Sequence, residues 1–145
     1  MQPMDDTFTH AHFSQLMNQL ATAWSEQNTE AALECFANNA IYMEPPNIQL
    51  YRGHEQLRPY FAALEPGTYL ALHNLCFNES TQVGMAEYTF GMAGSDIADV
   101  GIIVVTLENE KIRNWREYQR KGPADFNQFI AHEGKEFEWH IGNYP

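Results

Sequence analysis

The chain has 145 residues, the usual size of one domain built around one core. Its 19 acidic residues outnumber 8 basic ones, and the resulting formal charge of −11 argues against nucleic acid or an anionic membrane as a partner. The apolar content of 44% is typical of a globular protein, not of a disordered chain.

No apolar run approaches a signal peptide or the roughly 20 residues of a membrane span, so we expect a cytoplasmic protein. Cys35 and Cys76 form no CxxC pair, which predicts reduced thiols. The two histidines of "HAH" at residues 10–12 would point apart on a helix, and no phosphate loop or dinucleotide fingerprint occurs. We therefore expect no metal and no cofactor.

Three helices are predicted in the first half of the chain. Residues 12–28 place apolar side chains at helical spacing, and residues 29–39 suggest a shorter helix that Thr29 caps and Asn38-Asn39 ends. A third helix is expected near residues 53–64, where Pro59 requires either a late start or a kink. The apolar face of the first helix comprises Phe13, Leu16, Met17, Leu20, Ala23 and Trp24.

Strands are predicted around and after the third helix. Residues 40–43 favour a short strand that Pro45-Pro46 ends, so Glu44 lies at a strand end, and residues 48–51 extend again. Short turns then separate four further strands, which predicts an antiparallel meander at residues 68–79, 82–92, 96–107 and 111–120.

The segment after the last strand, residues 121–145, is rich in aromatic side chains. Gly122-Pro123 breaks the chain, and the spacing that follows predicts one short amphipathic helix. We expect this extension to fold back, either over the mouth of the domain, where Trp139 or His140 would restrict ligand access, or onto a neighbouring subunit.

Three stretches of the sequence resemble the nuclear transport factor 2-like superfamily, and within it the SnoaL-like proteins. They are "ATAWSEQNTEAALECFANNAIYMEPP", "YRGHEQLRPYF" and "KIRNWREYQR", and the resemblance covers roughly residues 12–120. It implies an α+β fold in which three N-terminal helices pack in a strongly curved antiparallel sheet, a cone-shaped, cystatin-like α+β barrel with a cavity. The same cone serves isomerases, cyclases, dehydratases, an epoxide hydrolase and non-catalytic modules.

The resemblance also suggests site residues. "FANNAIYMEPP" is similar to the ketosteroid isomerase segment in which an acid before proline is the general base, which points to Glu44. The oxyanion tyrosine and aspartate of that family fall on Leu20 and near Ile103. "WREY" and "GMAEYTF" are similar to the epoxide hydrolase stretches that carry paired acids, which points to Glu117 and Glu87.

The bridging arginine of the epoxide hydrolases falls on Met85, which would line the cavity. His73 is a candidate proton shuttle, or else a satisfied core histidine, and Tyr42 is a candidate cavity hydroxyl on the face of Glu44. Trp24 and Trp115 are expected to line the core or cavity.

Two functions remain open at this point. The first is a cofactor-independent lyase, isomerase or hydrolase that acts on a small apolar molecule through these carboxylates. The second is a non-catalytic ligand-binding or assembly module, in which Glu44 is an exposed strand end and the other two acids form salt bridges or face solvent. Apolar residues on the convex face of the sheet further predict a homodimer.

Overall fold

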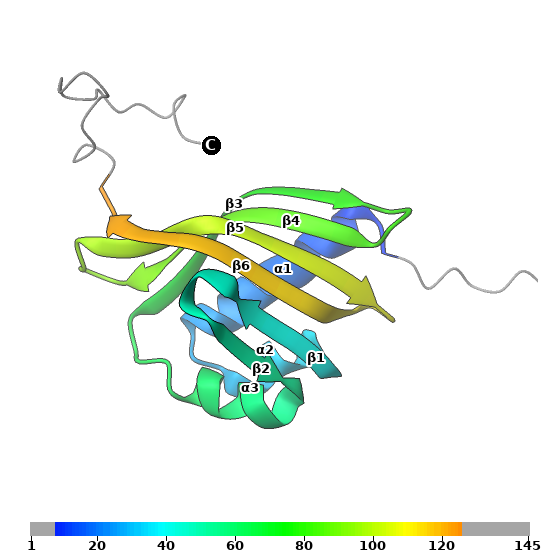
Figure 1. The fold of residues 1–145 in the computed structure, drawn as a ribbon, viewed down its shortest axis with the longest axis horizontal. Coiled ribbons are helices and arrows are strands. Elements are labelled where there is room, and N and C mark those ends of the chain that lie inside the picture. The colour runs from blue at the N-terminus through cyan, green and yellow to red at the C-terminus, as the bar shows by residue number, and fades with distance from the viewer. Residues whose placement is uncertain (1–7, 126–145) are drawn as a thin grey trace, which may run out of the picture.

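The computed structural model describes residues 8–125, and the terminal extension beyond residue 125 lies outside the described residues. The described residues form three α-helices and six strands (Figure 1). In chain order they are α1 (His10–Ser25), α2 (Thr29–Glu34), β1 (Phe36–Glu44), a 3-10 turn (Pro45–Asn47), β2 (Gln49–Arg52), α3 (Gly53–Ala62), β3 (Thr68–Asn78), β4 (Val83–Met92), β5 (Ile97–Glu108) and β6 (Lys111–Pro123).

Helix α1 forms where its apolar spacing predicts. Thr9 caps the helix by accepting a hydrogen bond from the backbone N–H of His12, and the His12 ring accepts one from the backbone N–H of Thr9. The predicted apolar face is buried along its whole length. The ring of Phe13 packs against β4 at Gly84, where an added Cβ would lie 2.4 Å from the ring. Gly84 therefore permits the close approach of α1 to the sheet.

The second helix is shorter than the sequence indicates. It ends at Glu34, and its cap is Asn28, whose side chain accepts from the Ala31 N–H. The predicted continuation to Asn39 is wrong, because β1 begins at Phe36 and pairs with β6. Backbone hydrogen bonding to a distant strand outweighs the local helical pattern there.

The third helix begins at Gly53 and includes Pro59, so of the two alternatives, a late start or a kink, the late start is wrong. Gly53 has a φ of +68°, and a Cβ there would lie 2.8 Å from the Asn38 carbonyl oxygen. Glycine at this position lets the chain turn from β2 into the helix beside β1.

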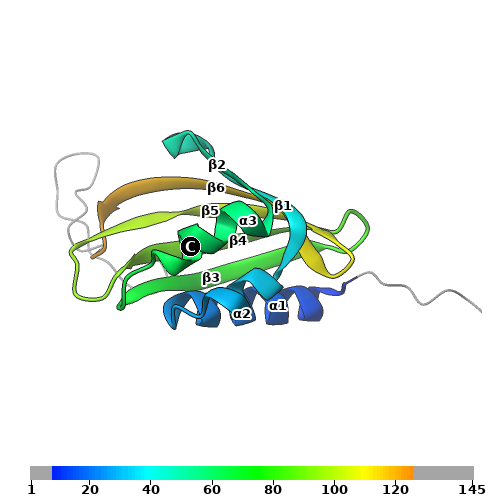
Figure 2. The ribbon, with the colours of Figure 1, turned by 90° about the horizontal axis from the view of Figure 1, so that it is seen from below.

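The six strands form one sheet in the order β2-β1-β6-β5-β4-β3. The meander from β3 to β6 is antiparallel, as predicted, but β1 runs parallel to β6. In Figure 2 the strands curve around α3, while α1 lies along β3. The fold is thus α+β, with helices packed against one side of a curved, open sheet.

Aromatic side chains fill the space between the sheet and the helices. Trp24 of α1 stacks on Trp115 of β6 at a centroid distance of 6.1 Å, and Trp115 stacks on Tyr42 of β1 at 5.6 Å. Phe61 of α3 meets the edge of Trp24 at 5.0 Å. Leu20 and Ile103 are fully buried in the same cluster. These rings bring the inner faces of β1 and β6 together around the candidate site.

Candidate functional site

The carboxyl group of Glu117 lies inside the domain and accepts hydrogen bonds from three side chains. Its side chain is on the inner face of β6, and the residue is 5% exposed. Trp115 Nε1 donates to Oε1 at 2.8 Å, Tyr88 Oη donates to Oε2 at 3.0 Å, and the Tyr42 hydroxyl also donates to Oε1. An indole N–H can only donate, so this surrounding suits a carboxylate, which only accepts.

Glu44 is the hydrogen-bonded partner of Glu117. It ends β1, it is 7% exposed, and its Oε1 accepts from Gln119 Nε2 at 3.1 Å. Burial raises the pKa of Glu44 to about 7, and the charge of Glu117 and the hydrogen bond to it act in the same direction. Glu44 therefore exchanges a proton near neutral pH, where an ordinary glutamate is fully ionised.

The hydrogen bonds around the two carboxyl groups decide which of them ionises first. Burial also raises the pKa of Glu117, whereas the hydrogen bonds from Tyr42, Trp115, Tyr88 and Glu44 lower it. Because four donors converge on Glu117, the negative charge resides there and the proton resides on Glu44. We call these two residues the carboxyl pair.

Further tyrosines surround the carboxyl pair. The hydroxyls of Tyr42 and Tyr60 are 3.4 Å apart, which brings α3 to the site. Burial raises the pKa of Tyr60, and the charge of Glu117 raises it further. The pKa of Tyr88 is raised for the same two reasons. These phenols stay protonated and can act as hydrogen-bond donors.

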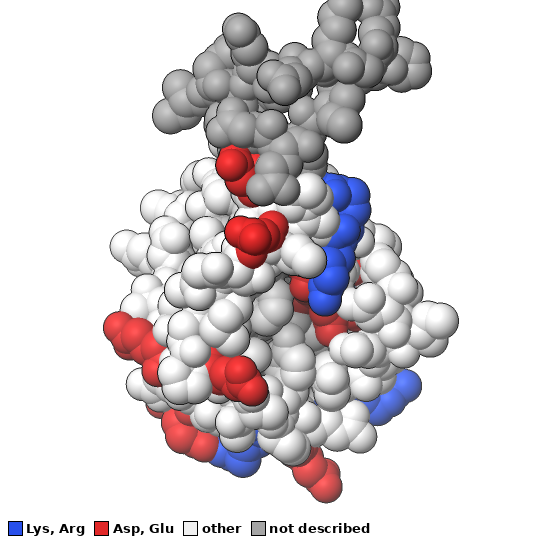
Figure 3. All heavy atoms as spheres, turned by 90° about the vertical axis from the view of Figure 1, so that its left-hand side faces the viewer, with Lys and Arg blue, Asp and Glu red and all other residues white. Residues whose placement is uncertain are grey.

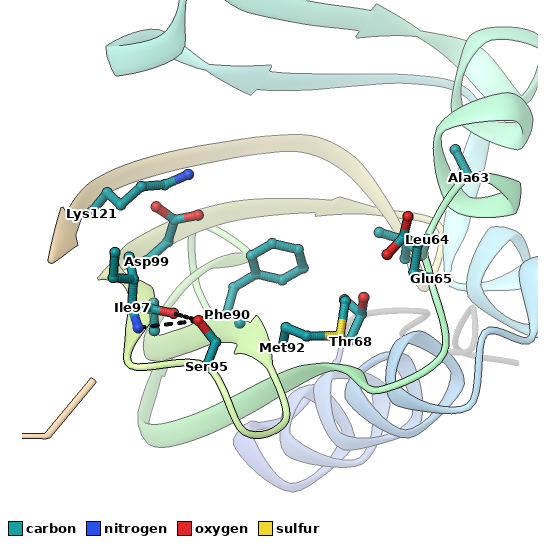
Figure 4. A pocket seen from close by; sticks show the side chains of 12 residues that line it. Ala63, Leu64, Glu65, Thr68, Phe90, Met92, Ser95, Ile97, Asp99 and Lys121 are labelled. Atoms are coloured by element: carbon teal, nitrogen blue, oxygen red, sulfur yellow. Dashed lines mark hydrogen bonds between the residues drawn. The ribbon is translucent and has the colours of Figure 1, made fainter. Parts of the chain in front are cut away.

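An open pocket of about 420 Å³ lies between the connection from α3 to β3 and the β4–β5 hairpin, and Asp99 of β5 and Lys121 of β6 line it. Figure 4 shows Asp99 and Lys121 at one end, Leu64 and Glu65 at the other, and the ring of Phe90 between them. Asp99 raises the pKa of Glu44 by its charge, which links pocket and pair. Figure 3 looks into a hollow on this side of the molecule, in which acidic and basic side chains lie close together.

Two buried polar atoms near the carboxyl pair make no hydrogen bond within the described residues. Gln119 Oε1 is an acceptor, and Trp24 Nε1 is a donor on a residue that is 2% exposed. Buried polar atoms are normally satisfied, so each indicates a site for water or a ligand. Within residues 8–125, no three His, Cys, Asp or Glu side chains are grouped as a metal site requires.

The structure does not bring Glu87, His73 and Met85 to this site. Met85 is 45% exposed, and the carboxylate of Glu87 accepts from Asn74 Nδ2 at 3.0 Å on the face of the sheet away from the core. His73 is exposed and bonds to Thr89. The prediction that Met85 lines the cavity is wrong, and so is the prediction that Glu87 and Glu117 share it.

The reason for this separation is strand alternation. Gly84, Ala86 and Tyr88 are buried on the core face of β4, so Glu87 must face outward. On β3, an irregularity between Leu72 and Leu75 interrupts the pattern near His73.

Several residues of the site were missed in the sequence, Tyr60 of α3 among them. Tyr88 shares its strand face with the small residues of β4, and that face turns out to be the core face. Gln119 is two residues beyond Glu117 and therefore on the same face, a signal that alternation provides. Asp99 of β5 lies opposite Lys121 of β6, and its place at the site becomes visible only when the pairing of these two strands is known.

The sequence matches the family model of the SnoaL-like domain over residues 17–115, which are 99 of the 145 residues. The chain belongs to this family. No curated protein matches it in sequence.

Solved structures similar to this SnoaL-like protein support the fold. A protein of unknown function with a cystatin-like fold from Methylobium petroleophilum has a TM-score of 0.70 at 16% identity, with 96% of this chain and 99% of that chain covered. A putative ketosteroid isomerase from Kribbella flavida has a TM-score of 0.68 at 12% identity, with 94% and 100% covered. An LEH-like epoxide hydrolase from M. tuberculosis has a TM-score of 0.65 at 11% identity, with 77% and 84% covered.

Because these structures share only 11 to 16% of their residues with this chain, the similarity shows the fold alone. None of the helices in the described part of the chain has the length and apolar character of a membrane span.

Proposed function

We propose that this SnoaL-like protein is a cofactor-independent enzyme that transfers a proton to or from a small, largely apolar molecule. The observation that carries this proposal is the carboxyl pair, in which a buried glutamic acid with a pKa of about 7 is hydrogen-bonded to a carboxylate. A general acid or base works best when its pKa is close to the working pH. Lyase, isomerase and hydrolase reactions of the kind named for similar folds all require such a step.

Each member of the pair has a distinct role in this proposal. Glu44 donates or accepts the proton, because near neutral pH both of its forms are populated. Glu117 is a positioning residue, since its two oxygens already accept from Tyr42, Trp115 and Tyr88. Its negative charge holds the proton on Glu44, and a reaction that removes the proton must overcome that attraction.

The competing function is a ligand-binding module without chemistry. The saturation of Glu117 by hydrogen bonds favours it, because a fully bonded buried carboxylate can fix the positions of β1, β4 and β6 without taking part in a reaction. In that case Glu44 would bind a ligand without exchanging a proton with it.

An activity measurement separates these two functions. Cyclohexene oxide probes hydrolytic ring opening, and cyclohex-3-enone probes migration of a double bond. We expect turnover of a probe whose rate depends on one group that titrates near pH 7, and a loss of kcat/KM of about 100-fold or more in Glu44→Gln.

The control is Glu26→Gln, which removes an exposed carboxylate at the end of α1 and should leave the rate unchanged. Equal rates for Glu44→Gln and the wild-type protein would contradict the catalytic proposal.

A further inference from the structure

The lining of the pocket carries more negative than positive charge. It includes the carboxylates of Glu65 and Asp99 and the ammonium group of Lys121. The carboxyl pair adds further negative charge, because Glu44 lies close enough to Asp99 for the charge of Asp99 to raise its pKa. An anionic ligand would be repelled from this space, whereas a cation would be attracted.

Asp99 is half-buried at the pocket, and among the described residues it forms no ion pair. Lys121 lies directly opposite it on β6, but no oxygen of Asp99 is within 4 Å of the Lys121 nitrogen. Lys121 is exposed, so water and salt screen its charge, and Asp99 retains its attraction for a second cation.

Gln119 adds an unsatisfied acceptor on β6, the strand that also carries Glu117 and Lys121. Its side-chain nitrogen donates to Glu44, which leaves its Oε1 buried without a partner. Gln119 precedes Lys121 by two residues on β6, so both side chains leave the same face of the sheet. A ligand N–H placed here would satisfy this oxygen.

The remaining walls are apolar and aromatic. Leu64, Met92 and Ile97 line the pocket, and so does Phe90, whose ring meets Trp24 edge-on at 6.0 Å. Figure 4 shows the Phe90 ring in the middle of the pocket. An aromatic face attracts a cation, and the aliphatic side chains would bury the apolar part of a ligand.

We propose that the pocket binds small molecules that carry a protonated amine on an apolar body, with the amine between Asp99 and Gln119. The proposal rests on the proposed function, because it names the substrate class of the same site. The ammonium group donates to the Asp99 carboxylate and to Gln119 Oε1, and the apolar body packs on Phe90.

Calorimetric titration at pH 8 with two probes of matched shape tests the proposal. Cyclohexylamine is protonated at this pH, whereas cyclohexanol is neutral. We expect the amine to bind at least 10-fold more tightly than the alcohol. Asp99→Asn should weaken amine binding about 10-fold and leave alcohol binding unchanged. The matched control is Asp96→Asn, which removes an exposed charge from the same β4–β5 hairpin outside the pocket and should change neither affinity.

A second measurement uses the unmodified protein. A bound ammonium group stabilises ionised Glu44, so amine binding at pH 6.5 should release up to one proton, which calorimetry in buffers of different ionisation heat detects. The titratable and charged groups around Glu44 are Tyr42, Tyr51, Tyr60, Tyr88, Asp99, Glu117 and, at the pocket, Lys121.

Equal or tighter binding of cyclohexanol, no binding of either probe, or no effect of Asp99→Asn would overturn the amine proposal. None of these results bears on proton transfer, because both titrations are made without turnover. Failure of the proposed function would appear separately, as equal activity of Glu44→Gln and the wild-type protein.

Discussion

Two glutamates in contact differ in protonation because their neighbours differ. Glu117 accepts from Tyr42, Tyr88 and Trp115, so its charge is well solvated by protein groups. Glu44 receives one amide hydrogen bond, from Gln119, and faces the charge of Glu117. When two carboxyl groups are adjacent, ionising both is unfavourable because the two negative charges repel. The group that accepts more hydrogen bonds keeps the charge.

This difference has a consequence for stability. The pKa of Glu44 is raised from 4.5 to about 7 in the folded state, so the folded state binds the proton more tightly than the unfolded state does. The stabilisation is present in full below pH 4.5 and is lost as pH rises through 7. We expect the free energy of unfolding to fall by up to about 3 kcal/mol over this range.

Urea unfolding at pH 5 and pH 8 measures this effect. Glu44→Gln has a neutral side chain at both pH 5 and pH 8, so its free energy of unfolding should fall less between them than that of the wild-type protein. At pH 8 the variant should be the more stable of the two proteins. Glu26→Gln, an exposed control, should follow the wild-type curve. Parallel curves for Glu44→Gln and wild type would exclude the raised pKa.

The sequence predicts part of the site at the level of residues. Glu44 and Tyr42 share a face of a short strand before Pro45-Pro46, and the structure places both beside Glu117. The resemblance of "GMAEYTF" to an epoxide hydrolase strand predicts that Glu87 lies in the same cavity, and the structure places it on the outer face. Alternation gave Glu87 and Tyr88 opposite faces, but it could not tell which face meets the helices.

At the scale of elements, local patterns predict the meander well and the region around β1 poorly. The strands from β3 to β6 join neighbours through short turns, so their pairing is local. The position of β1 depends on β6, which is about 75 residues away: the Ile112 N–H donates to the Cys35 carbonyl at 2.9 Å. The local sequence pattern carries no information about a hydrogen bond to so distant a strand. It therefore predicts a helix that is longer than α2, which ends at Glu34.

The parallel pairing of β1 with β6 also assembles the carboxyl pair. Tyr42 lies opposite Trp115 and Met43 opposite Arg116, so Glu44 comes to the level of Glu117 on the inner face. The site therefore depends on the pairing of two strands that are far apart in the sequence.

At the scale of the whole molecule, the outer face of the sheet carries an apolar patch. Met85, Ile102 and Tyr118 are 45%, 45% and 47% exposed on neighbouring strands. Exposed patches of this kind often mark an interface between subunits.

We predict a homodimer that buries this face. Light scattering at micromolar concentration should give twice the 16.7 kDa of one chain. Ile102→Asp should shift the mass to that of a monomer, because it would bury a charge in the interface. Ile48→Asp, at a position that is exposed beyond the end of β1, is the control and should leave the dimer intact. A single-chain mass for the wild-type protein would contradict the prediction.

The central claim is that Glu44 holds the proton of a buried carboxyl pair. Carbon-13 NMR of protein with labelled glutamate carboxyls measures it directly, with Glu44→Gln to assign the resonance. We predict one carboxyl resonance that titrates near pH 7 and is missing from the variant. If the resonance lost in Glu44→Gln instead titrates near pH 4.5, Glu44 is an ordinary ionised glutamate and the proposed chemistry has no basis.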